Sequence, residues 1–156
     1  MALYLVQHGK SLSKDVDPDQ SLSDEGTAET KRIAQVARGY QVSIGRIKQS
    51  GKKRARQTAD IFAEALQPAG GVEEVGGLKP LDDVTAFAAT IDAAADTMLV
   101  GHLPFMERMT SYLVAGSADK SIFRFQNSGI VCLEKDPQSG SWIIVWTLMP
   151  KIGSAS

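Results

Sequence analysis

The chain contains two histidines, and each follows a short apolar segment. His8 comes directly after residues 2–7, and His102 comes directly after residues 97–101. If both segments are strands of an open α/β sheet, the two imidazoles lie just beyond the carboxyl ends of those strands, where such sheets bind ligands. Neighbouring strands would bring the two rings to one crevice, whereas separated strands would leave two unrelated loop histidines.

A cluster of basic residues lies at the start of a predicted helix, within residues 50–58. Positive side chains there oppose the helix dipole, but a bound anion would reverse that balance because it meets both the side chains and the free N–H groups. Arginine adds a planar fork that matches phosphate oxygens. A solvated helix start or a short nucleic-acid patch would carry the same residues, which are Lys52, Lys53, Arg54 and Arg56.

Together these residues favour phosphoryl transfer. That reaction needs a positioned nucleophile and fixed positive charge around the equatorial phosphoryl oxygens. His8 supplies an imidazole nucleophile, and His102 and Arg54 supply the clamp without a metal. One cysteine and two histidines do not favour a zinc cluster, so we expect neither a metal site nor a cofactor.

Four segments resemble, in order, the motifs of the histidine phosphatase superfamily. They are residues 7–10 (Gln-His-Gly-Lys), 21–26, 50–58 and 101–104 (Gly-His-Leu-Pro). Each motif is weak alone, but four in the same order are specific. The short length and the His-Leu-Pro form resemble the SixA-type phosphohistidine phosphatases, because the larger mutase relatives carry insertions for which this chain has no room.

The resemblance implies a role for each matching residue. His8 matches the nucleophile that becomes phosphohistidine, Arg54 a phosphate-clamping arginine, and His102 the second histidine, which is expected to be cationic. The remaining candidates for phosphate binding are Gln7, Gly9, Lys10, Ser50, Asn127 and Ser128. The last two precede a predicted strand and are candidates either for binding phosphate or for holding His102, although their residue types also favour turns.

The chain departs from the superfamily pattern at three places. Gln7 stands where an arginine is usual, and Gly51 stands where a proline is usual. Charge-assisted hydrogen bonds are about twice as strong as neutral ones, so Gln7 predicts weaker phosphate affinity. Residues 76–78 (Gly-Gly-Leu) offer no carboxylate where mutase-like relatives carry a glutamate, and the sequence does not identify the general acid.

The absence of this glutamate is consistent with a phosphohistidine substrate. The imidazole of phosphohistidine leaves readily once it is protonated, so the reaction demands less of a dedicated general acid. The resemblance therefore implies a phosphatase acting on phosphohistidine in a protein, such as a signalling histidine phosphotransfer domain, with phosphate or sulfate as pocket ligands. Two alternatives stay open. One is a phosphomonoesterase for a small metabolite, and the other, suggested by Gln7, is a non-catalytic phosphate or phosphoprotein binding module.

Strand-like and helix-like segments alternate along the chain. This order predicts an α/β three-layer sandwich with a mostly parallel sheet and an antiparallel edge hairpin, and the resemblance implies the phosphoglycerate mutase-like fold. Ser23 is predicted to cap a helix whose apolar face includes Ile33, Val36, Ala37 and Tyr40. The alternation of strand residues predicts that Trp142 and Trp146 share one face.

Length and composition support a single domain over residues 1–150 with a tail at 151–156. The net charge of −1 does not favour coating nucleic acid or an anionic membrane, and no apolar run approaches the ~18 residues of a membrane span. Residues 1–6 are predicted to be a strand rather than a signal peptide. The single cysteine, Cys132, fits a reducing compartment, so we expect a cytoplasmic protein with no nucleic-acid or membrane partner.

Overall fold

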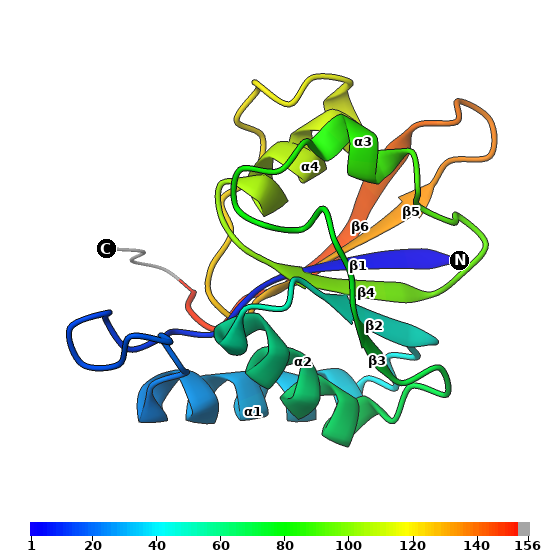
Figure 1. Cartoon of the computed structure of the whole chain (residues 1–156). Coiled ribbons are helices and arrows are strands. Elements are labelled where there is room, and N and C mark those ends of the chain that lie inside the picture. The colour runs from blue at the N-terminus through cyan, green and yellow to red at the C-terminus, as the bar shows by residue number, and fades with distance from the viewer. Residues whose placement is uncertain (153–156) are drawn as a thin grey trace.

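The computed structural model describes residues 1–152, and they form one six-stranded sheet covered by helices (Figure 1). The strands lie in the order β3-β2-β4-β1-β5-β6. In chain order the elements are β1 (Ala2–Gln7), α1 (Asp24–Gly39), β2 (Arg46–Gln49), α2 (Lys53–Leu66), β3 (Val72–Glu74), α3 (Val84–Ala88), β4 (Thr97–Gly101), α4 (Phe105–Ala115), β5 (Ile130–Lys135) and β6 (Trp142–Leu148). The predicted α/β class with a phosphoglycerate mutase-like arrangement is confirmed.

The four strands that alternate with helices are parallel, and β5 and β6 add an antiparallel edge. In the register of β1 and β4, Gln7 lies opposite Gly101. In the register of β2 and β4, Gln49 lies opposite Val100. Because these three neighbouring strands end at the same level, the residues that follow them converge at one edge of the sheet.

Helices cover both faces of the sheet. Figure 1 shows α1 and α2 on one face and α3 and α4 on the other. Two separate apolar clusters fill the two interfaces, one centred on Phe62 and Ile47 and the other on Phe105 and Leu99. The central strands β1 and β4 contribute to both clusters, which explains why their sequences are almost continuously apolar.

The cap of α1 is confirmed, but two of the residues predicted for its buried face are exposed. The Ser23 hydroxyl accepts a hydrogen bond from the Gly26 N–H, as expected for an N-cap. Val36 is 36% exposed and Tyr40 is 81% exposed. The helix ends at Gly39, so Tyr40 no longer follows the helical period, and Val36 lies to the side of the stripe that faces the sheet. That stripe consists of Gly26, Thr30, Ile33, Ala34 and Ala37.

The prediction that Trp142 and Trp146 share a face is wrong. Trp142 packs in the cluster under α3 and α4, whereas Trp146 packs against the cluster under α1 and α2. The pairing of β5 with β6 shifts register between Cys132 and Leu133, which pair with Trp146 and Ile144. A β-bulge of this kind inserts one extra residue, and the alternation of side chains reverses across it.

No helix within residues 1–152 is long and apolar enough to cross a membrane. Of the tail predicted for residues 151–156, positions 153–156 lie outside the described residues.

The segment that follows β1 lies directly against the first turn of α1. The Ser23 N–H donates to the Lys10 carbonyl at 3.0 Å. A Cβ atom at Gly26 would come within 2.0 Å of the same carbonyl oxygen. Only glycine therefore lets the helix approach the backbone that carries the first histidine.

We expect Gly26→Ala to lower the free energy of unfolding by about 2 kcal/mol, because the added methyl group forces these backbones apart. Gly39→Ala is the matched control in the same helix, since a Cβ atom there meets nothing within 4 Å. Alanine is the better helix former, so the control should be neutral or slightly stabilising. Urea unfolding measures both variants, and equal losses of stability would contradict the packing argument.

Candidate active site

His8 is the first residue after β1, and its backbone is held on both sides by neighbouring segments. The His8 N–H donates to the Gly101 carbonyl at 2.9 Å, which continues the pairing of β1 with β4. The Asn127 side-chain amide donates to the His8 carbonyl at 2.8 Å. Asn127 therefore holds His8, whereas the sequence had suggested support for His102 or contact with phosphate.

One tautomer of the His8 ring follows from its contacts. Nδ1 lies 2.7 Å from the Gly9 carbonyl oxygen, which can only accept, so Nδ1 carries the proton. Nε2 then has the lone pair, and Arg54 Nε donates to it at 3.3 Å. Gly9 is itself fixed, because its N–H donates to Thr58 Oγ1 at 2.8 Å and that hydroxyl donates to the Arg54 carbonyl at 2.8 Å. A single turn of α2 thus positions both the base and its cationic neighbour.

His102 lies directly after β4, and its ring centroid is 5.0 Å from that of His8. The side chain is almost fully buried, with 1% exposure. Nε2 lies 2.6 Å from the hydroxyl oxygen of Ser50, which directly follows β2. Nδ1 has no hydrogen-bond partner among residues 1–152. The two histidines and Arg54 therefore meet at one edge of the sheet, as the strand ends require.

The two imidazoles are neutral bases. Burial, the largest cause, lowers the pKa of His8 from 6.5 to about 4, and the positive charge of Arg54 acts in the same direction. Burial also lowers the pKa of His102 to about 3, with further contributions from the nearby His8 ring, which disfavours protonation of both rings together, and from the positive charges of Arg54 and Lys52. The expectation of a cationic His102 therefore differs from the structure, because a buried ring among positive groups sheds its proton.

The remaining candidates surround this centre at different depths. Lys10 is exposed and pairs with Glu25 at 3.0 Å. Gln7 lies at the end of β1, and its Oε1 is buried without a hydrogen-bond partner in the described part of the chain. The Ser128 hydroxyl is buried and bonded to that of Thr30 at 2.6 Å, behind Gly9 rather than beside the rings.

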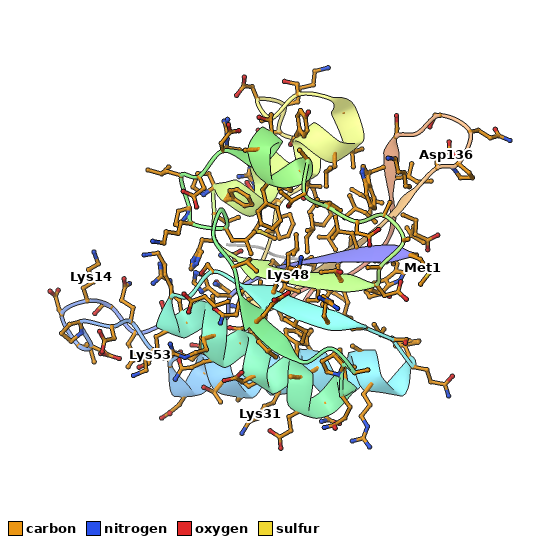
Figure 2. All side chains as sticks on the ribbon, turned by 45° about the vertical axis from the view of Figure 1, so that its right-hand side comes forward. Met1, Lys14, Lys31, Lys48, Lys53 and Asp136 are labelled. Carbon is orange, nitrogen blue, oxygen red and sulfur yellow. The ribbon has the colours of Figure 1, made fainter. Side chains whose placement is uncertain are left out.

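Basic residues of the predicted cluster lie at this same edge. Figure 2 shows Lys14, on the segment after β1, and Lys53, in the first turn of α2, on one side of the molecule, with Met1 on the opposite side. The charge of Lys53 reaches the same segment, where it contributes to lowering the pKa of Asp17, an effect that comes mainly from hydrogen bonds with Ser21. Of the predicted cluster, Arg54 therefore contacts His8, Lys53 lies toward the segment that follows β1, and Arg56 is exposed.

Sequence reasoning did not assign roles to Thr58 and Thr30. Thr58 is the last residue of the basic motif at residues 50–58, but nothing in that motif predicts its hydrogen bond with the Gly9 N–H. Thr30 lies in the middle of α1, where nothing in the sequence marks it. A Cβ atom at Gly9 would come within 2.6 Å of the Thr30 hydroxyl oxygen, so Thr30 leaves no room for a side chain at the residue that follows His8.

The sequence profile of the histidine phosphatase superfamily (branch 1) matches residues 3–82, which is just over half of the chain. The chain belongs to this superfamily. The phosphohistidine phosphatase SixA of Escherichia coli is 26% identical over 96% of this chain and 94% of that protein. An uncharacterized protein of Picosynechococcus is 32% identical over 85% of this chain and 84% of that protein.

Solved structures share the same architecture. The structure of the protein histidine phosphatase SixA complexed with tungstate has a TM-score of 0.83 at 26% identity and covers 96% of this chain and 97% of that chain. A mycobacterial glucosyl-3-phosphoglycerate phosphatase has a TM-score of 0.72 at 16% identity, covering 93% and 98% of the two chains, and shows the common fold alone. These similarities support a phosphatase within the superfamily.

The lowered histidine pKa values predict how stability depends on pH. Between pH 6.5 and about 4 the unfolded chain binds more protons at His8 than the folded chain does, so stability is complete above pH 6.5 and falls as the pH drops toward 4. His102 acts in the same direction. We expect urea unfolding to show lower stability at pH 5 than at pH 7.

A His8→Gln variant should show a smaller difference between the two pH values, because it has one titrating ring fewer. The chain has only two histidines, so NMR can follow both rings directly. A His8 or His102 ring that titrates near pH 6.5 would contradict the predicted shifts.

Proposed function

We propose that this protein removes phosphate from phosphohistidine in a protein, through a phosphohistidine intermediate on His8. The observation that carries the proposal is the state of the His8 ring. Its Nδ1–H is bound to the Gly9 carbonyl, and its Nε2 lone pair is directed to the place where Arg54 donates. A neutral imidazole with one fixed tautomer is a nucleophile that needs no further activation.

The proposed reaction has two displacements. The Arg54 N–H leaves His8 Nε2 and turns to the phosphoryl oxygens, which frees the lone pair. His8 Nε2 then attacks phosphorus, the bond between phosphorus and the substrate imidazole breaks, and that imidazole leaves with a proton taken from solvent. Water then attacks the phosphoryl group on His8, which yields inorganic phosphate and the free ring. Arg54 stabilises the equatorial oxygens with its charge and His102 with a hydrogen bond, so positioning and electrostatics supply the catalysis.

Two further observations support a phosphohistidine substrate. Residues 76–78 carry no carboxylate, and a phosphoramidate needs a weaker acid than a phosphate ester does. The SixA relative is named a phosphohistidine phosphatase, and the SixA structure was solved with tungstate, an oxyanion. The protein is expected to act in the cytoplasm on a phosphorylated signalling protein such as a histidine phosphotransfer domain.

The test compares wild type with His8→Asn, which keeps a side chain of similar shape but removes the nucleophile. We expect wild type to dephosphorylate a protein carrying ³²P-phosphohistidine and to retain acid-labile label after rapid quenching, and the variant to show neither. A sugar phosphate and the phosphohistidine protein are compared at equal concentration. Faster turnover of the sugar phosphate would replace the proposal with a phosphomonoesterase, and binding without labelling of His8 would replace it with a binding module.

A binding module is favoured by one observation, the neutral Gln7, whose buried Oε1 has no hydrogen-bond partner within residues 1–152. Where the superfamily pattern has a second cation, this chain has an amide. Phosphate contacts that lack a charge are weaker, so either affinity or turnover is expected to be reduced.

We expect Gln7→Arg to bind inorganic phosphate on the order of tenfold more tightly, because a charged hydrogen bond replaces a neutral one. The matched control is Gln138→Arg, which makes the same change of charge on the exposed turn beside Asp136, at the opposite side of the molecule from Lys14 (Figure 2). Calorimetric titration with phosphate measures both. Equal affinities for Gln7→Arg and wild type would show that Gln7 does not limit phosphate binding.

A further inference from the structure

The contact between Ser50 and His102 is a buried hydrogen bond between two segments that follow neighbouring strands. Ser50 follows β2 directly and is 4% exposed, and His102 follows β4 directly and is 1% exposed. Their side chains meet at 2.6 Å, between Ser50 Oγ and His102 Nε2. In a polar pair that is removed from water in this way, one direction of donation is favoured, because a buried polar group without a hydrogen-bond partner destabilises the fold.

The surroundings of Ser50 indicate the direction of this bond. The backbone N–H of Lys52 points to Ser50 Oγ at 3.4 Å, so the oxygen already accepts from the main chain. The only other polar contact of this hydroxyl within residues 1–152 is His102 Nε2. If the ring donated to Ser50, the buried hydroxyl hydrogen would have no acceptor. Donation by Ser50 satisfies both groups and leaves the ring proton on Nδ1.

The other nitrogen of His102 supports the same tautomer. Nδ1 is buried and has no protein partner in the described part of the chain, and its ring lies 5.0 Å from that of His8. Because the two rings are this close, a phosphoryl group on His8 would bring negative oxygens near the His102 ring. An Nδ1 lone pair would repel those oxygens, whereas an Nδ1–H donates to them.

We infer that Ser50 is a positioning residue that holds His102 as the neutral Nδ1–H tautomer, so that His102 acts on the phosphoryl group as a hydrogen-bond donor rather than as a permanent cation. The catalytic part of this inference rests on the proposed phosphatase function. The tautomer itself does not, because it can be measured on the protein alone.

The experiment determines the protonated nitrogen of each histidine by long-range ¹H–¹⁵N NMR at pH 7 and measures kcat on a phosphohistidine protein. In wild type we expect the proton of His102 on Nδ1. In Ser50→Ala we expect a shift of His102 toward the Nε2–H form and a loss in kcat of about tenfold or more, the scale expected when a transition-state donor is lost. Ser50→Thr keeps the hydroxyl and should restore both.

Ser111→Ala is the matched control. Ser111 is also a buried serine, in α4, and the acceptors next to its hydroxyl are the carbonyls of Glu107 and Lys120. This variant should keep the wild-type tautomer and kcat. It thereby distinguishes the general effect of removing a buried hydroxyl from the specific effect of removing the Ser50 hydroxyl. His102 protonated on Nε2 in wild type, or on Nδ1 in Ser50→Ala, would overturn the inference. Absence of phosphatase activity with the expected tautomers would instead overturn the proposed function.

Discussion

The hydrogen bond from His8 Nδ1 to the carbonyl of the next residue, Gly9, is the constraint on which the site depends. It fixes the ring orientation and leaves the lone pair on Nε2, beside Arg54. The bond needs the Gly9 carbonyl in one orientation, and the Thr58 hydroxyl holds the preceding peptide by accepting from the Gly9 N–H. Because Thr58 and Arg54 belong to one helical turn, nucleophile and cation are positioned by the same element.

The parallel sheet brings the other groups to this point. Strands β2, β4 and β1 are neighbours, and Ser50, His102 and His8 each follow one of them directly. Three polar side chains therefore reach one edge of the sheet, beyond the carboxyl ends of the strands, where open α/β sheets bind ligands. The antiparallel strands contribute less to the chemistry, although Asn127, just before β5, secures the His8 backbone.

Burial sets the electrostatic character of the site. Both rings are neutral because they are removed from water beside a guanidinium, and Gln7 adds an amide where the superfamily pattern has a charge. Arg54 is then the permanent cation in contact with the nucleophile. In the proposed function a phosphoryl group would meet the charge of Arg54 directly, with the charge of Lys52 close to His102, and directed hydrogen bonds would orient it.

Apolar periodicity and motif order are local properties of the chain, and from them the sequence predicts the fold class and most of the strands and helices. The sequence left open whether His8 and His102 share one crevice, and the strand order β2-β4-β1 brings their ring centroids to 5.0 Å. The partner of Asn127 and the contact of Ser50 with His102 follow from the folded arrangement, since they join residues far apart in sequence. The tautomer of His8 depends on the adjacent Gly9 carbonyl, and the distant Thr58 fixes the backbone beside it. The sequence also failed to predict that Trp142 and Trp146 lie on opposite faces of the sheet. The reason is that a β-bulge arises from pairing between two strands and not from the alternation of residues within one strand.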